Sequence, residues 1–135
     1  MFLKEKKTMA IKLKLRNKKG EFKTYYQEFV PYRKRLDYLK EEAEITDEYE
    51  KFVQQLPVDN NGKPIIPTAE YTDYELKLAN FRAEFVANLF DDKTVTKDAI
   101  LDGMEPSDAT DEIMNIIMYD VLGYKKEDED EESPK

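Results

Sequence analysis

The sequence contains neither cysteine nor histidine among its 135 residues. The absence of cysteine removes disulfides, thiolate nucleophiles and zinc–cysteine sites, and it permits a reducing compartment. The absence of histidine removes the commonest general base and a usual ligand of transition metals. The aspartates Asp91, Asp92, Asp98 and Asp102 do not follow the spacing of an EF-hand loop, and acids near helix starts complement the helix dipole. We therefore predict a protein that is not an enzyme and uses no metal or cofactor.

Glycine and long apolar runs are also scarce. The four glycines are scattered, so the sequence has no phosphate-binding loop or dinucleotide fingerprint. No apolar run approaches the roughly 20 residues that cross a bilayer. The basic residues 1–8 lack the apolar stretch of a secretory signal. We expect a soluble cytoplasmic protein with no membrane association.

Charged residues make up 39% of the chain and are unevenly distributed. Residues 1–25 carry nine basic and two acidic side chains, whereas residues 26–124 carry ten basic and 22 acidic ones. A basic arm beside an acidic body is one pattern of nucleic-acid binding. However, no RNA or DNA motif accompanies the lysines, and alternate lysines on a hairpin form a solvated face that discourages edge-to-edge strand pairing. We predict no nucleic-acid partner.

The secondary structure begins with a β-hairpin. Apolar and basic residues alternate from Ile11 to Arg16, as in a half-buried strand. A turn at residues 17–20 and a second strand at residues 22–26 complete the hairpin. Two strands alone are marginally stable in water, so helices or another subunit must cover the apolar face.

The sequence pattern predicts four to five helices after the hairpin. The first runs from Pro31 to about Glu44, and a second begins with a cap at Thr46 or Asp47 and closes before Pro57. The apolar face of the first contains Tyr32, Leu36, Leu39 and Ala43. Residues 57–68, rich in proline, asparagine and glycine, are expected to form an exposed loop between two helical layers.

The longest helical pattern, residues 69–90, is expected to form the centre of the core. Its main stripe contains Tyr74, Leu78, Phe81, Phe85 and Leu89. A short helix follows, with Thr96 as its N-cap and Gly103 at the position of a C-terminal cap. The last helix spans residues 108–122 and ends at Gly123. The predicted class is mainly α with a short N-terminal β-hairpin, an α+β fold.

The apolar arc of the last helix is wider than one core-facing stripe. It contains Ile113, Met114, Ile117, Met118, Val121 and Leu122. Two interpretations apply. The residues fill the core under the long helix, or they bind a partner through adaptable methionine side chains. Both hold if the arc serves the core on one side and a groove on the other, so we name these six residues as candidate partner-binding residues.

The chain divides into three parts. Residues 1–9 form a flexible extension, residues 10–124 a helical domain with the N-terminal hairpin, and residues 125–135 an acidic tail. The tail has six acidic residues and no aliphatic side chain, so burial cannot offset the entropy of ordering it, and we expect it to be disordered. It acts either as a solubilising brush or as a competitor for a basic partner.

Four segments carry a family resemblance through their order and spacing. They are Phe29–Lys34, then Ala83–Phe90 (AEFVANLF), and finally Thr94–Gly103 together with Met114–Gly123 (MNIIMYDVLG). None is a catalytic signature. Across residues 10–124 the chain resembles the tail assembly chaperones of siphophages, especially phages of Gram-positive bacteria.

The resemblance implies a helical chaperone that binds the tape measure protein, keeps it soluble and helps recruit subunits of the major tail tube protein. It implies action in the host cytoplasm and absence from the mature virion. In this family a longer form often arises by ribosomal frameshifting near the end of the reading frame, and the acidic tail would then be its linker.

Other functions remain open from the sequence. An acidic regulatory or DNA-mimicking protein would occupy a basic surface of a nucleic-acid enzyme. Such binding should collapse with salt, whereas binding through apolar surface should persist. A carboxylate-based hydrolase would need two acids facing each other in a cleft. Self-association into a homo-oligomer is also compatible, because the hairpin offers an edge and the last helix offers apolar surface.

Overall fold

The computed structural model describes residues 11–125. The elements are β1 (Ile11–Arg16), β2 (Phe22–Gln27), α1 (Tyr32–Gln54), α2 (Thr68–Ala87), α3 (Lys97–Gly103), α4 (Pro106–Asn115) and the π-helix η2 (Ile116–Val121). This order confirms the predicted class, mainly α with an N-terminal β-hairpin. The predicted extension 1–9 and residues 126–135 of the predicted tail lie outside the described residues.

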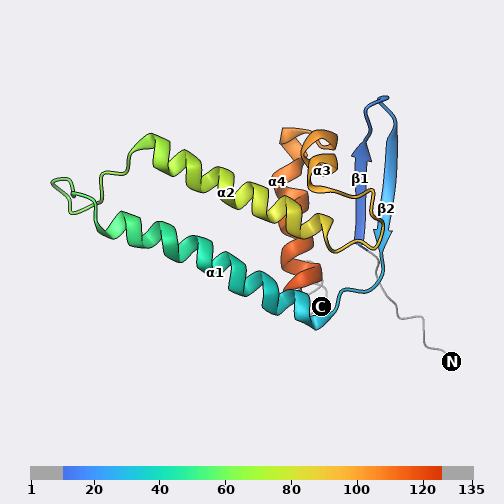
Figure 1. Ribbon diagram of the computed structural model, residues 1–135, viewed down its shortest axis with the longest axis horizontal. Helices are drawn as coiled ribbons and strands as arrows, with labels where there is room; N and C mark the ends of the chain where they lie inside the picture. The colour runs from blue at the N-terminus through green and yellow to red at the C-terminus, as the bar shows by residue number, and fades with distance from the viewer. Residues whose placement is uncertain (1–10, 126–135) are drawn as a thin grey trace, which may run out of the picture.

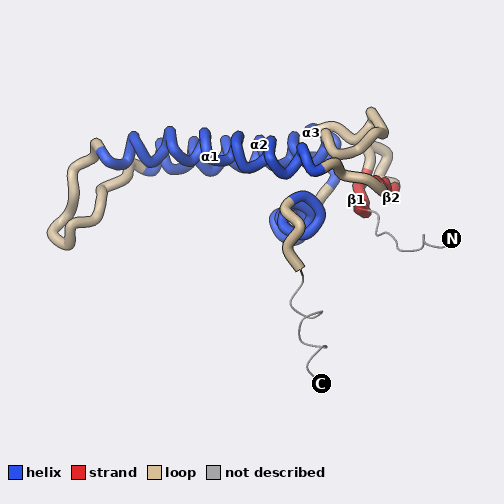
Figure 2. Tube along the Cα trace, turned by 90° about the horizontal axis from the view of Figure 1, so that it is seen from below, coloured by secondary structure: helices blue, strands red, loops and turns tan. Residues whose placement is uncertain are grey.

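The helices α1 and α2 form a long helical hairpin, and the other elements gather at one end of it (Figure 1). In the perpendicular view, α1 and α2 form one layer, and α4 with η2 crosses beneath it and is seen end-on (Figure 2). The loop that joins α1 to α2 lies at the end farthest from the strands. We call residues 41–79, the distal part of this helical hairpin, the arm.

The β-hairpin forms as predicted because apolar side chains alternate along β1. Its buried residues are Ile11, Leu13 and Leu15. β1 pairs antiparallel with β2 along its whole length. In the turn, the Oδ1 atom of Asn17 accepts a hydrogen bond from the backbone N–H of Glu21 at 3.0 Å, and Gly20 takes a φ of 86°.

The prediction of two helices between residues 31 and 56 was wrong, because α1 is continuous. The helix contains no proline or glycine, so nothing interrupts its hydrogen-bond ladder. Ion pairs of 3.2 Å between Lys40 and Glu44 and of 3.3 Å between Lys51 and Asp47 link successive turns on both sides of the expected break. The cap available at Thr46 therefore goes unused.

The packed face of α1 also differs from the expected one. The expected face, Tyr32, Leu36, Leu39 and Ala43, is exposed. Instead Tyr38, 1% exposed, stacks on the ring of Phe81 and meets the ring of Phe85 edge-on, with both centroid distances 5.2 Å. Aromatic clusters of this kind bury large areas, so the face that meets the rings of α2 is the one that packs.

The loop between α1 and α2 is exposed, as predicted, and contains an antiparallel bridge between Val58 and Pro64. It connects two neighbouring helices of one layer and not two layers, which corrects the expected arrangement (Figure 2). Only the second half of α2 reaches the core: its buried residues are Ala83, Phe85, Val86 and Ala87. The first half belongs to the arm.

The short helix α3 begins as predicted, because the Thr96 hydroxyl accepts a hydrogen bond from the backbone N–H of Ala99 at 3.0 Å. The expected role of Gly103 as a C-terminal cap was wrong, because Met104 holds that position. Gly103 is the last residue of the helix, and its φ is not positive. It is buried against β1, where a Cβ atom would lie 2.9 Å from the carbonyl oxygen of Arg16.

The last helical segment begins at Pro106 and changes from α to π geometry at Ile116. The wider i→i+5 turn allows Ile116, Ile117 and Val121 all to be buried. Gly123 then ends the segment with a φ of 82°, as predicted. The core therefore lies where the second half of α2 meets β1, α3 and η2.

Candidate binding surface

The structure divides the six candidate residues of the last helix into two groups. Ile117 and Val121, 0% and 6% exposed, belong to the core. The others are half-buried: Ile113, Met114, Met118 and Leu122. The carbonyl of Leu122 accepts a hydrogen bond of 3.2 Å from Nε of Arg35, which fixes the end of η2 against α1. The arc therefore serves the core on one side and presents half-buried side chains on the other.

Ile113 and Met114 meet α2 and α3 at an open groove of about 220 Å³. Its apolar lining residues are Leu78, Ala79, Leu101, Ala109, Ile113 and Met114. Glu75, Arg82 and Thr110 supply the polar ones. Leu101 is 46% exposed. We call this feature the α2–α4 groove. An apolar, partly open groove with methionine in its wall suits an adaptable apolar ligand.

A hydrogen-bonded cluster holds α1 and α2 together beside this groove. Nη2 of Arg82 donates to Glu42 at 3.0 Å, and Nε donates to the hydroxyl of Tyr38 at 3.2 Å. The Tyr38 hydroxyl in turn donates to Glu42 at 2.7 Å. Burial, followed by the bond to Glu42, raises the pKa of Tyr38 to about 12. The Arg82 guanidinium therefore has a structural role, because its charge-assisted hydrogen bonds orient it towards α1.

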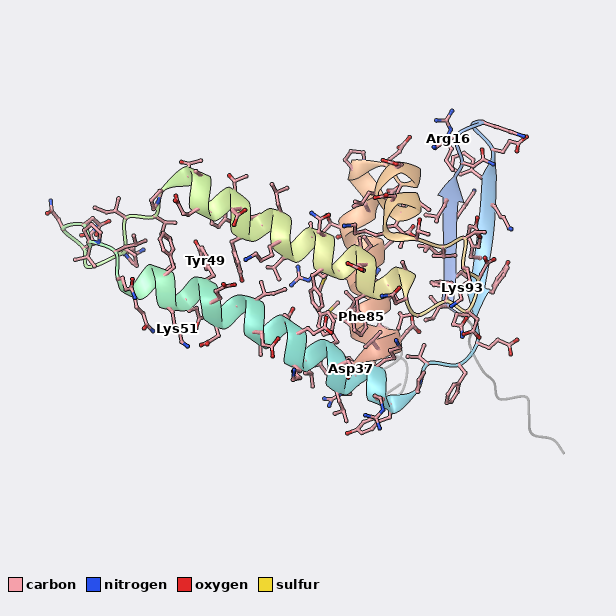
Figure 3. All side chains as sticks on the ribbon, viewed as in Figure 1. Arg16, Asp37, Tyr49, Lys51, Phe85 and Lys93 are labelled. Carbon is pink, nitrogen blue, oxygen red and sulfur yellow. The ribbon has the colours of Figure 1, made fainter. Side chains whose placement is uncertain are left out.

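A second hollow, of about 200 Å³, lies in the arm between α1 and α2. Its floor contains Ile45 and the rings of Tyr49 and Tyr74, which stack with centroids 3.9 Å apart. Figure 3 shows Tyr49 between the two helices. Its rim carries Glu48, paired with Lys77 at 3.3 Å. Across residues 11–125, the Tyr49 hydroxyl is buried without a hydrogen-bond partner.

Two of the predicted partner-binding residues, Ile113 and Met114, line the α2–α4 groove, whereas Leu78 and Leu101 were not among the predicted ones. The sequence placed Leu101 in the short helix after Thr96 with no binding role, and it placed Leu78 on the main stripe of the longest predicted helix. A signal was present, because Ile100 and Leu101 are adjacent, so one of them must face away from the core of a short helix. Ile100 is the buried residue of the two.

The chain was compared with models of known protein families. The model of the phage tail chaperone protein family matches residues 6–135, almost the whole chain.

The chain belongs to the phage tail chaperone family. This membership confirms the resemblance to phage tail assembly chaperones that the sequence showed. No curated protein and no solved structure matches the chain.

The family gives the chaperone a role in tail assembly and a phage tail protein as its partner. Chaperone families are generally non-enzymatic, and they act on partners through exposed binding surface. Among residues 11–125, no helix of the chaperone is both long and apolar enough to cross a membrane.

Proposed function

We propose that this phage tail chaperone binds the tape measure protein in the host cytoplasm and keeps it soluble until subunits of the major tail tube protein replace it. On this proposal the chaperone acts without catalysis and is absent from the mature virion. The chaperone would also help recruit these tail tube subunits, and a frameshifted longer form would present the same domain with a C-terminal extension.

The observation that supports client binding most directly is the α2–α4 groove. It combines exposed Leu101 with half-buried Ile113 and Met114 in one apolar concavity at the surface. A client segment that places an apolar side chain there removes both apolar surfaces from water. This burial stabilises the complex by about 25 cal/mol for each Å² of apolar area. Helical segments with apolar residues spaced three and four apart fit such grooves.

The acidic alternative also has an observation in its favour. The helical parts of the arm, residues 41–54 and 68–79, carry nine acidic and two basic side chains. Binding through this charge would weaken steeply with salt, because the screening length falls from about 10 Å at 0.1 M salt to about 3 Å at 1 M. Binding through the groove would persist, since burial of apolar surface is not screened.

The test is co-expression of the full chain with the tape measure protein encoded by the same phage. We expect a soluble complex that survives high salt on a sizing column. The variant Leu101→Asp should weaken the complex at least tenfold, because burying an unpaired carboxylate is costly.

Leu76→Asp is the matched control, since Leu76 is 57% exposed and does not line the groove. It should leave the complex unchanged. A tape measure protein that precipitates regardless would overturn the holding role. Equal loss in both leucine variants would instead remove the groove from the proposal, and dissociation by salt alone would favour the acidic alternative.

A further inference from the structure

The outer strand of the hairpin has a free edge. β2 has β1 on one side only and is the outermost described element at its end of the molecule in both views (Figures 1 and 2). At the opposite edge of the hairpin, α3 covers the Arg16 end of β1, because Gly103 packs against the backbone of Arg16. An uncovered strand edge is a template for pairing with another strand.

The register identifies which backbone groups are free. The N–H of Asn17 donates to the carbonyl of Glu21, so the hydrogen-bonded pairs of the ladder continue through Lys23, Tyr25 and Gln27. The backbone groups of the alternate residues must therefore point away from β1. These residues are Phe22, Thr24 and Tyr26. The equivalent groups of Arg16 on β1 do point away from the hairpin, towards α3.

Nothing else in the described structure pairs with this edge. Within residues 11–125, no backbone hydrogen bond outside the hairpin reaches Phe22, Thr24 or Tyr26. The side chains of these three residues share the outer face of the hairpin and are exposed, Phe22 at 61% and Tyr26 at 59%. The edge therefore offers both unpaired backbone and exposed aromatic rings.

We propose that β2 pairs antiparallel with β2 of a second copy, giving a continuous four-stranded sheet across a two-fold axis at Thr24. In this register Thr24 lies opposite Thr24 of the second copy, and Phe22 lies opposite Tyr26. All three opposed positions are hydrogen-bonded pairs, so every free backbone group between Phe22 and Tyr26 finds a partner. A shift by one residue would put opposed side chains on different faces and leave these groups unmatched.

The side chains favour a second copy as the occupant. Aromatic pairs and threonine pairs on opposed positions stabilise antiparallel strands. On the inner face, Lys23 would lie opposite Tyr25 of the second copy, and its ammonium already lies 4.8 Å from the Tyr25 ring within one copy. No like charges are directly opposed.

The distribution of charge between the two strands does not oppose pairing through β2. Lysines on an edge strand discourage pairing, but Lys12, Lys14 and Arg16 belong to β1, the strand on the far side of β2 from the free edge. β2 carries one charged residue, Lys23. A short strand buries less area than the roughly 1,200 Å² of a small stable interface, so the contact is expected to be weak and concentration-dependent.

Cross-linking tests the register in the full chain, which has no native cysteine. The T24C variant should form a disulfide-linked dimer under mild oxidation, because the opposed Cα atoms would be about 5.5 Å apart, within the range of a disulfide. The Y26C variant is the matched control. Its two sulfurs would be four residues apart along the sheet, about 13 Å, and should not link. Mixing Y26C with F22C should restore the link.

Sedimentation velocity tests the same contact without oxidation. T24K and T24E should each remove self-association, because each places like charges opposite one another. An equal mixture of the two should restore it, and T24V, which keeps the backbone N–H, should associate as the wild type does. Circular dichroism spectra and melting curves identify variants that fail to fold.

A wild-type chain that stays monomeric at every concentration overturns the proposal, as does equal cross-linking of T24C and Y26C. If the wild type is monomeric but T24K loses the tape measure protein, the edge belongs to a client strand and self-pairing is wrong. No client is present in the cross-linking or sedimentation experiments, so their failure leaves the proposed chaperone function untouched.

Discussion

Replacement of Gly103 by alanine separates what helix propensity predicts from what packing predicts. Gly103 closes the short helix α3, where its φ is not positive. On propensity alone, alanine should stabilise a helix by up to about 1 kcal/mol. In the fold, however, a Cβ atom at this position would lie 2.9 Å from the carbonyl oxygen and 3.2 Å from the nitrogen of Arg16, and 3.2 Å from Cβ of Leu15.

The contacts of the added methyl group decide the sign. Two of its three neighbours are backbone atoms of β1, which cannot move aside as the end of a side chain can. Overpacking of this kind costs about 1–3 kcal/mol. The propensity gain applies in full only in a helix interior, so it offsets part of this cost, and we expect the free energy of unfolding to fall by up to about 2 kcal/mol. For a domain of this size, each kcal/mol corresponds to a fall in Tm of about 3–5 °C.

Thermal and urea unfolding followed by circular dichroism measure this change. Asp102→Ala is the control, because Asp102 is the neighbouring helical residue and is exposed. Removal of an acid from the last helical turn should leave Tm unchanged or raise it slightly. A Gly103→Ala variant that is as stable as the wild type, or more stable, would show that α3 does not lie as close to β1 as described.

Three further predictions concern buried side chains. Tyr49→Phe should raise the free energy of unfolding by about 1 kcal/mol in urea melts, because it removes a buried hydroxyl that has no partner among residues 11–125; a loss would reveal a hidden partner. Between pH 10 and 12 the free energy of unfolding should fall more steeply for the wild type than for Tyr38→Phe. The folded state raises the pKa of Tyr38 to about 12, so the neutral hydroxyl stabilises the fold fully below pH 10, and this stabilisation is lost as the pH rises towards 12. Parallel stability–pH curves would contradict this. Ile117→Ala should cost about 2–5 kcal/mol in the same melts and Met118→Ala clearly less, since Ile117 is fully buried and Met118 is half-buried; equal losses would place Met118 in the core.

Local patterns were sufficient wherever a residue's neighbours in the chain determine its conformation. The alternation from Ile11 to Arg16 predicted β1, and the Thr96 hydroxyl predicted the start of α3. Gly123 predicted the end of the last segment. Each of these features depends on contacts within a few residues, such as strand alternation, a capping hydroxyl or a positive φ. The family resemblance, confirmed across residues 6–135, likewise came from ordered local motifs.

Choices between competing local patterns were decided only by the tertiary structure. α1 carries one apolar stripe through Leu36 and another through Tyr38, and periodicity cannot rank them. The rings of Phe81 and Phe85 on α2 bury the stripe with Tyr38 and leave Leu36 exposed at 45%. Similarly, the π turn of η2 draws Ile117 inward, while the half-buried Met114 borders the α2–α4 groove.

The sequence by itself therefore determined the β-hairpin, the mainly α fold class and the family, but not the continuity of α1. The tertiary structure decided which faces are covered, including the role of Gly103 and the free edge of β2. The physical reason is that burial depends on residues far apart in the chain, and a helix with two apolar stripes has no preferred side until another element packs against one of them.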